Sequence, residues 1–247
     1  MLIESNQNAK YKRWMKLKQK KYRTQLNQFI VEGEHLVEEA ILANAVCEVI
    51  IKDGNQDKFQ QLTQPFETYY LKDNLFNAIA STEAPQPIMA ICHIREQSLT
   101  NKSRLLLLDR VQDPGNLGTL IRSAVAFNFN GVILSEGCVD LYNEKVIRST
   151  QGAIFKLPIE IKSLENEVKN LMAEGISVYG TSLQNGYPLQ EIPSGEKMAF
   201  ILGNEGSGVS QALLEQTKQN IFVEMSKNIE SLNVSIAGSI IMHHFRQ

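Results

Sequence analysis

The sequence predicts an α/β protein: a C-terminal, mostly parallel sheet covered by helices on both faces, preceded by a small α/β domain. The first observation is that short apolar runs alternate with segments of helical periodicity in the second half of the chain. The second is that residues 105–108 are entirely apolar, as strands buried on both faces are. The third is a similar alternation within residues 1–95.

The N-terminal elements are predicted from apolar runs, helical spacing and turn residues. In chain order we expect a β-rich run at residues 29–33, a helix at 34–42, strands at 46–51 and 68–71, a helix at 73–79 and a strand at 88–94. We predict a first domain over residues 1–97, a polar linker over residues 98–104 and a second domain over residues 105–247.

The second domain carries the clearer pattern. After the strand at residues 105–108, we expect a turn at residues 113–116 and a helix at 117–127. The other expected strands are at residues 132–134, 178–181, 199–202 and 221–223, and the other helices at 143–150, 164–173, 211–216 and 234–245. Strands that alternate with helices in this way form parallel sheets.

Composition is that of an ordinary globular protein, with 43% hydrophobic and 21% charged residues. The three cysteines, Cys47, Cys92 and Cys138, are odd in number and widely spaced, which argues against a disulfide framework or a zinc site. We find no signal-peptide pattern, and no apolar run approaches the roughly 20 residues that a membrane span needs. A cytoplasmic protein without a metal site is expected.

The net charge of −2 hides a basic segment at residues 10–23, which holds eight Lys or Arg and no acid. Tyr11, Trp14 and Tyr22 are interleaved with these cations. Basic side chains beside flat aromatic rings suit an RNA backbone with exposed bases. The alternative is a solvated basic helix whose aromatic rings pack on the domain, and the sequence leaves both open.

Three loops rich in glycine or asparagine, at residues 115–118, 203–208 and 226–233, each follow an apolar strand. Ligands bind at the carboxyl ends of parallel strands, so the three loops can converge on one site. Glycine allows the main chain to approach a ligand closely. Any one loop taken alone is better explained as an ordinary tight turn, whereas the three together are harder to explain in that way.

A dinucleotide is the obvious rival ligand, and a nicotinamide-dependent dehydrogenase the corresponding function. That fingerprint requires Gly-x-Gly-x-x-Gly after a first strand. The loop at residues 203–208 instead has the spacing Gly-x-x-Gly-x-Gly and lies late in the chain. The phosphate-binding pattern Gly-x-x-x-x-Gly-Lys-Ser/Thr is also missing, which disfavours both nucleotide-binding classes.

The three segments resemble the motifs of the SpoU/TrmH branch of the SPOUT, or trefoil-knot, RNA methyltransferases. The motifs are Asp-Pro-Gly-Asn-Leu-Gly at residues 113–118 followed by Arg122, Gly-Asn-Glu-Gly-Ser-Gly at residues 203–208, and Ser-Leu-Asn-Val-Ser at residues 231–235. The resemblance covers residues 105–247 in the family's order. Residues 1–95 also resemble the family's N-terminal substrate-binding domain, which is similar to ribosomal proteins of the L30e type.

The resemblance implies a deep trefoil knot in the second domain, although connections in general do not thread through loops. It implies that S-adenosylmethionine is the cofactor, held largely by main-chain groups. By position, the cofactor-binding residues are Leu202, Gly203, Val223, Met225 and Leu232. It further implies a homodimer with each active site at the subunit interface, and methyl transfer to a ribose 2′-hydroxyl.

The residues that match the family's catalytic and polar positions are Arg122, Asn116, Glu205, Ser231 and Asn233. The family proposal gives Arg122 the role of base with the help of a substrate phosphate. An arginine stays protonated at neutral pH, so orientation and electrostatic stabilisation are physically easier roles. Glu205 is expected to position Arg122 or the substrate, while Asn116 and Asn233 suit fixing loops or orienting a ribose.

A different class of function is a non-catalytic RNA-binding protein that has kept the fold. The presence of all five polar positions argues against it, since binding alone does not require them. The L30e-like domain favours ribosomal over transfer RNA as the substrate. The adjacent His243 and His244 point to different helix faces, which disfavours a shared metal.

Overall fold

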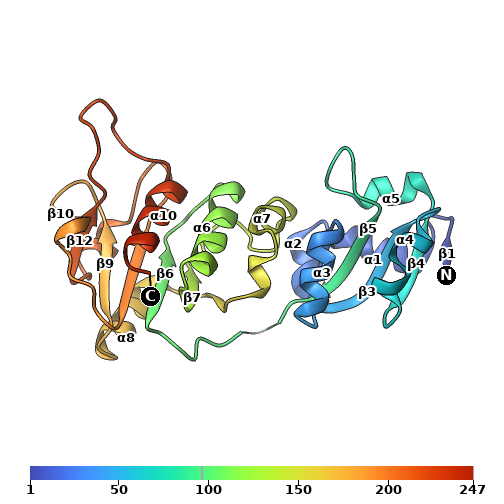
Figure 1. Cartoon of the computed structure of the whole chain (residues 1–247), viewed down its shortest axis with the longest axis horizontal. Helices are drawn as coiled ribbons and strands as arrows, with labels where there is room; N and C mark the ends of the chain where they lie inside the picture. Colours follow the sequence, from blue (N-terminus) through green and yellow to red (C-terminus); the bar gives the residue numbers. More distant parts are fainter. Residues whose placement is uncertain (96, 247) are drawn as a thin grey trace. The chain divides into compact units, whose positions relative to one another are not determined.

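A computed structural model describes residues 1–95 and 97–246. Residue 96, inside the predicted first domain, and residue 247, the last of the predicted second domain, lie outside the described residues. The chain forms two compact units. The first consists of Met1–Glu96 with Tyr142–Phe155, and the second of Gln97–Leu141 with Lys156–Gln247. Each unit has its own sheet (Figure 1).

The first unit contains a mixed five-stranded sheet in the order β1-β4-β3-β5-β2. The strands are β1 (Leu2–Ile3), β2 (Gln28–Glu32), β3 (Val46–Lys52), β4 (Glu67–Leu71) and β5 (Ile88–His93). Strands β1, β4 and β3 run parallel, whereas β5 is antiparallel to both β3 and β2. The predicted small α/β domain is therefore present in this part of the chain.

Five helices surround this sheet: α1 (Ala9–Lys16), α2 (Lys20–Leu26), α3 (Glu34–Leu42), α4 (Gln56–Thr63) and α5 (Asp73–Ile79). Trp14 is fully buried and Tyr11 is 5% exposed, and both belong to the core with Ile50 and Phe76. Their burial excludes a role for these two rings as open stacking platforms for RNA bases. For Tyr11 and Trp14, the alternative that the aromatic rings of the basic segment pack on the domain is therefore correct.

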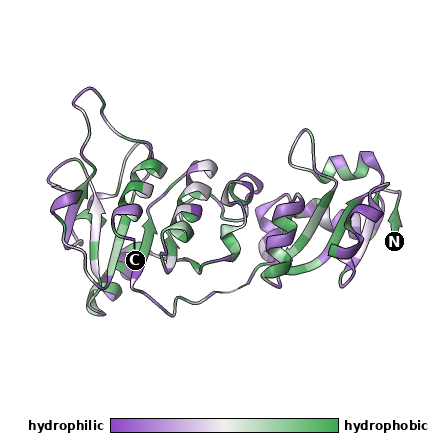
Figure 2. Ribbon diagram, in the orientation of Figure 1, coloured by the Kyte–Doolittle hydropathy of each residue, from purple (hydrophilic) through white to green (hydrophobic). Residues whose placement is uncertain are grey.

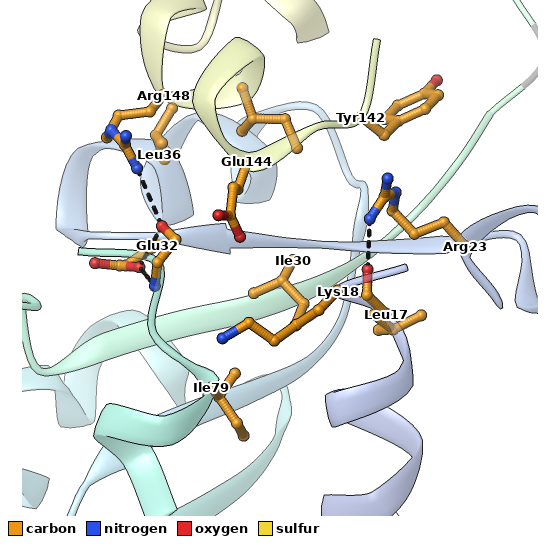
Figure 3. Close-up of a pocket in the computed structure, with 12 residues that line it drawn as sticks. Leu17, Lys18, Arg23, Ile30, Glu32, Leu36, Ile79, Tyr142, Glu144 and Arg148 are labelled. Atoms are coloured by element: carbon orange, nitrogen blue, oxygen red, sulfur yellow. Dashed lines mark hydrogen bonds between the residues drawn. The ribbon is translucent and has the colours of Figure 1, made fainter. Parts of the chain in front are cut away.

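The segment Tyr142–Phe155, which follows β7 by several residues, packs with the first unit. It contains α7 (Glu144–Thr150) and a 3₁₀ turn (Ala153–Phe155). Tyr142 lies 4.8 Å from the Phe29 ring, between ring centroids. Arg148 donates to the Ser81 hydroxyl at 3.1 Å, and Ser81 donates to Glu32 (Figure 3). Arg148 and Glu32, which line a small cavity in this unit, are thus bonded to the protein itself.

The second unit contains an all-parallel seven-stranded sheet in the order β10-β12-β9-β11-β6-β7-β8. The strands are β6 (Arg104–Leu108), β7 (Gly131–Leu134), β8 (Ile159–Ile161), β9 (Ser177–Thr181), β10 (Tyr187–Pro188), β11 (Met198–Leu202) and β12 (Gln219–Phe222). All residues of β6, β7 and β11 are buried, as their continuous apolar runs predict. The strands are accordingly green in Figure 2.

Helices cover both faces of this sheet, as predicted. They are α6 (Pro114–Ala126), α8 (Leu164–Ala173), α9 (Gln211–Leu214) and α10 (Val234–His244). Leu105 and Leu107 face the core formed with α8 and α9. On the other face, α10 packs against α6 (Figure 1). Phe200 of β11 stacks there on Phe245, with ring centroids 4.7 Å apart.

The predicted turn at residues 113–116 is wrong in its extent, because α6 already begins at Pro114. Asp113 caps the helix by accepting a hydrogen bond from the Asn116 N–H at 2.8 Å, and proline is favoured at the first helical position. Helices α1, α2 and α4 and the short strands β1, β8 and β10 were not predicted from periodicity. The knot stays a prediction. No helix among the described residues is both long and apolar enough to span a membrane.

Candidate functional site

The three predicted loops lie in the segments that follow β6, β11 and β12. Residues 203–208 follow β11 directly and residues 226–233 lie between β12 and α10, whereas residues 115–118, predicted as a loop, belong to the start of α6. Because all these strands are parallel, their carboxyl ends lie at one edge of the sheet. Strand β6 lies between β7, to which α6 connects it, and β11, which comes much later in the chain. This reversal of strand order is the switch point at which open α/β sheets bind ligands.

Glu205, in the loop after β11, holds the loop after β6. Its carboxylate accepts hydrogen bonds from the backbone N–H of Gln112 at 3.1 Å and of Asp113 at 3.0 Å. It also accepts one from the Asn116 side-chain amide at 3.1 Å. Partial burial raises the pKa of this carboxyl, but the bonds from Asn116 and the backbone outweigh burial and lower it.

Asn116 connects Glu205 and the loop after β6 to the third loop, which follows β12. Its carbonyl oxygen accepts from the Asn233 amide at 2.9 Å. The Asn233 oxygen in turn caps α10 by accepting from the N–H groups of Ser235 at 2.9 Å and Ile236 at 3.4 Å. In both Asn116 and Asn233, the side-chain nitrogen donates one hydrogen bond and the side-chain oxygen accepts another. The network therefore fixes the orientation of both amide groups. Three of the five predicted catalytic positions are therefore brought together.

The loop after β11 folds tightly on itself. Asn204 and Gly208 exchange two backbone hydrogen bonds of 3.1 and 2.9 Å, and the Asn204 side chain donates to the Arg110 carbonyl at 2.9 Å. A Cβ placed on Gly203 would lie 2.0 Å from the Gly208 carbonyl carbon and 2.1 Å from the Val209 nitrogen. Only glycine allows this backbone approach.

The segment after β12 offers main-chain groups to a ligand. Across the described residues, the backbone groups of Val223, Met225 and Leu232 have no hydrogen-bond partner. All three residues are half-buried, and their side chains are apolar. Apolar side chains beside unpaired main-chain donors and acceptors suit an adenosine-type ligand. The predicted cofactor residues in this segment therefore fit S-adenosylmethionine.

Arg122 and Ser231 stand apart from the network. Arg122 is exposed on α6, and in the described part of the chain its guanidinium makes no hydrogen bond or ion pair. The expectation that Glu205 positions Arg122 finds no direct contact, because the Glu205 bonds go elsewhere. Ser231 is exposed in the third loop. Both side chains are available to a substrate.

Sequence reasoning missed Asp109 and Arg110 at the end of β6. Asp109 is 4% exposed and accepts from the Ser210 N–H at 2.9 Å, which ties this loop to the start of α9. Arg110 pairs with Asp109 at 2.9 Å and has a left-handed backbone, with φ of 56°. A non-glycine residue in that region marks local strain. The signal for Asp109 in the sequence was the position of an acid directly after an apolar run.

Beside the site, α6 and α10 form a shallow open groove. Its lining residues are Thr119, Ser235, Ile236, Ser239, Ile240 and His243. Ile236 is 52% and Ile240 38% exposed, which leaves an apolar strip one helical turn long on α10. No group of three His, Cys, Asp or Glu residues that could hold a metal occurs among the residues described.

Comparisons with known proteins identify the family. The sequence profile of the SpoU rRNA Methylase family matches residues 103–243, and that of the MRM3-like substrate binding domain matches residues 8–90. A relative from Bacillus subtilis (strain 168), the 23S rRNA (guanosine(2553)-2′-O)-methyltransferase RlmP, is 46% identical over 245 residues, covering 99% of this chain and 98% of the relative.

Two solved structures share the fold over nearly the whole chain. An S-adenosylmethionine-bound rRNA methyltransferase from Sinorhizobium meliloti has a TM-score of 0.89 and 25% identity, covering 99% of this chain and 96% of that one. A putative RNA methyltransferase of the TrmH family from Porphyromonas gingivalis has a TM-score of 0.87 and 30% identity, covering 97% and 98%. The family predicted from the three motifs is confirmed: this chain belongs to the SpoU rRNA methylase family.

Proposed function

We propose that this chain methylates the ribose 2′-hydroxyl of a guanosine in 23S rRNA, at a position equivalent to guanosine 2553. Methyl transfer from S-adenosylmethionine to an RNA ribose is the activity predicted from the motifs and confirmed by the family. The particular nucleotide is supported by 46% identity, over 99% of the chain, to a relative named for that reaction. Acting on ribosomal RNA, the enzyme would work in the cytoplasm.

The observation that carries the proposal is the hydrogen-bonded chain Glu205–Asn116–Asn233. It joins all three loops at the carboxyl edge of the parallel sheet. Preorganised loops hold a cofactor and a substrate in a fixed relative orientation, which lowers the entropic part of the barrier to a transfer of this kind. We assign these three residues as positioning residues for the reaction.

The cofactor site is proposed to consist of Leu202 at the end of β11 and Gly203 directly after it, with Val223, Met225 and Leu232 around the third loop. The bound cofactor supplies an electrophilic methyl group on a sulfonium. The protein contributes main-chain donors and acceptors, apolar contact from half-buried side chains, and a tightly folded loop whose close backbone approach only Gly203 permits.

Arg122 is proposed to bind the RNA at the reacting nucleotide. Its guanidinium is exposed and unpaired within the described residues, so an RNA phosphate meets no competing carboxylate there. A protonated guanidinium orients that phosphate bidentately and stabilises negative charge developing on the 2′-oxygen. Ser231 is proposed to contact the same nucleotide from the third loop.

A homodimer is also proposed, with the α6–α10 groove as its interface. The exposed Ile236 and Ile240 supply apolar area, and Ser239, which bonds Ser123 at 2.8 Å, keeps the two helices together. Because Arg122 lies on α6, a partner docked here would complete the substrate site. Light scattering of Ile236→Lys with Ile240→Lys tests this: the variant should be monomeric, and an unchanged dimer would exclude this surface.

The function is tested by mapping 2′-O-methyl groups in cellular RNA with and without the gene. Loss of one methyl group at the 23S rRNA guanosine supports the proposal. An unchanged 23S rRNA, with a methyl group lost from transfer RNA, would overturn the choice of substrate. If no methyl group were lost anywhere, the non-catalytic RNA-binding alternative would replace it.

A further inference from the structure

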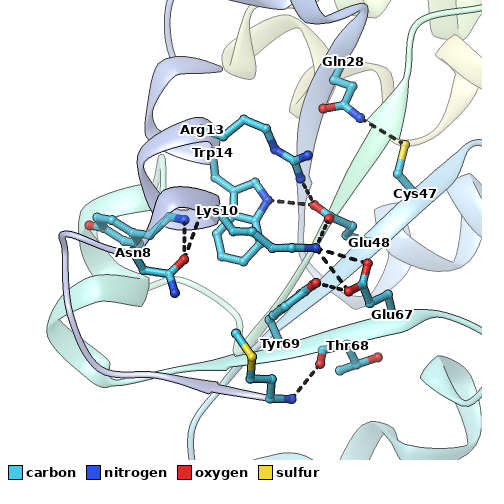
Figure 4. A network of polar contacts seen from close by, with 12 residues as sticks. Asn8, Lys10, Arg13, Trp14, Gln28, Cys47, Glu48, Glu67, Thr68 and Tyr69 are labelled. Carbon is cyan, nitrogen blue, oxygen red and sulfur yellow. Dashed lines mark hydrogen bonds and ion pairs between the residues drawn. The ribbon is translucent and has the colours of Figure 1, made fainter.

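The structure divides the basic segment at residues 10–23 into two classes. Lys10 and Arg13 pair with the buried carboxylate of Glu48, which also accepts from the Trp14 ring N–H at 2.9 Å (Figure 4). Burial raises the pKa of Glu48, but these three donors lower it overall. Arg23, 8% exposed, donates to the Leu17 carbonyl at 2.7 Å. These cations hold α1 and α2 on the sheet.

The second class consists of lysines that are exposed to solvent and form no ion pair with a carboxylate among the described residues. Lys16, Lys20 and Lys21 are exposed, and none forms an ion pair within the described residues. The two remaining lysines of the segment are also exposed but donate to neutral groups: Lys12 to the Gln7 side chain, and Lys18 to the carbonyls of Ala78 and Ala80. By contrast, ion pairs with acids occupy several other lysines, namely Lys10, Lys52, Lys58, Lys72, Lys102 and Lys162. Like charges repel one another over a screening distance of about 10 Å, and Lys20 and Lys21 are neighbours in the chain.

Tyr22 lies between two of these cations. The Lys16 ammonium is 5.4 Å and the Lys21 ammonium 5.9 Å from the centroid of its ring. The ring is half-buried and has no aromatic partner among the described residues. A cation near a ring face is attracted by the negative face of the ring. Tyr22 therefore brings together two side chains whose charges would otherwise drive them apart.

The position of Lys20 and Lys21 is unfavourable for the helix that carries them. Both occupy the first turn of α2, which contains no acid, and the N-cap Gln19 makes no side-chain cap bond. Cations next to the positive end of a helix dipole destabilise the helix, whereas acids at the same positions would stabilise it. Stability of the fold does not account for these lysines, whereas an anionic ligand does.

We infer that Lys16, Lys20, Lys21 and Tyr22, here called the Tyr22 patch, bind backbone phosphates of the substrate RNA. The inference rests on the proposed function, because it places the substrate of that reaction on the first unit. The three lysines contact phosphates, and Tyr22 is a positioning residue for Lys16 and Lys21. The patch contributes affinity without reading sequence, because phosphate contacts carry no base information.

The test is the salt dependence of binding to an in vitro transcript of 23S rRNA. Each lost phosphate contact reduces the slope of log K against log[salt] by about 0.7–0.9. The triple variant Lys16→Gln, Lys20→Gln, Lys21→Gln should lower the slope by about 2.1–2.7, so the affinity lost between 50 and 200 mM salt should shrink by about 18- to 42-fold. Tyr22→Leu should lower it less, and Tyr22→Phe should keep the wild-type slope.

The matched control is Lys58→Gln, Lys169→Gln, Lys197→Gln, which removes the same charge from exposed lysines elsewhere. Its slope should stay close to that of the wild type. Equal slopes for the triple variant and the wild type would overturn the inference, and so would equal losses in the triple variant and the control. Methylation of 23S rRNA measured alongside separates the two claims: a wild type that binds but does not methylate contradicts the proposed function alone.

Discussion

Replacing Asn116 with alanine removes the residue that joins the three loops. The change breaks the 3.1 Å bond to Glu205 and the 2.9 Å bond from Asn233. A bond to a neutral amide contributes about 1 kcal/mol and one to a charged group about 1.5–3 kcal/mol. Because Glu205 is exposed to solvent, we take the lower end for its bond. The free energy of unfolding should fall by about 2.5 kcal/mol.

Urea unfolding at pH 7 measures this loss, with Thr119→Ala as the control. Thr119 lies on the same helix, is exposed, and makes no hydrogen bond within the described residues. Its replacement should change the free energy of unfolding by less than about 0.5 kcal/mol. A double-mutant cycle of Asn116→Ala with Glu205→Gln should give a coupling of about 1 kcal/mol or more. Additive effects of the two changes would refute the connected network.

Two further changes probe the same loops. Gly203→Ala should abolish binding of S-adenosylmethionine in calorimetry, because its Cβ would lie 2.0 Å from the Gly208 carbonyl carbon; retained affinity would show that the loop yields. Since the folded-state pKa of Glu205 is lowered, its stabilising effect is complete above its ordinary value of 4.5 and is lost as the pH falls through the lowered pKa. Glu205→Gln should therefore flatten the decline of thermal stability below pH 4.5, whereas the exposed Glu136→Gln should not; parallel declines would contradict this.

The fold of the second unit could largely be predicted from the sequence, because strands buried on both faces must be continuous apolar runs. Residues 164–173 and 234–245 were predicted almost to the residue, since amphipathic spacing and caps mark their ends. Helix α4 and strand β10 were missed because one is short and polar and the other pairs only at an edge. Periodicity is weak in both cases.

The motifs predicted which residues belong to the site, but not which of these residues are hydrogen-bonded to one another. The order Glu205, Asn116, Asn233 joins residues about 90 to 117 positions apart, and no local pattern encodes such contacts. Likewise, the sequence alone could not separate Lys10, which pairs with a buried acid, from Lys20, which faces solvent. That distinction depends on which carboxylates the sheet places opposite each helix face.

Methyl transfer by the purified protein to a 23S rRNA transcript tests the central claim most directly. With labelled S-adenosylmethionine, the wild type should place one methyl group on the 2′-oxygen of a single guanosine. Arg122→Ala should lose this transfer while its affinity for S-adenosylmethionine, measured by calorimetry, stays nearly unchanged. A wild type that leaves the transcript unmethylated, or an Arg122→Ala variant that methylates at the wild-type rate, would contradict the account.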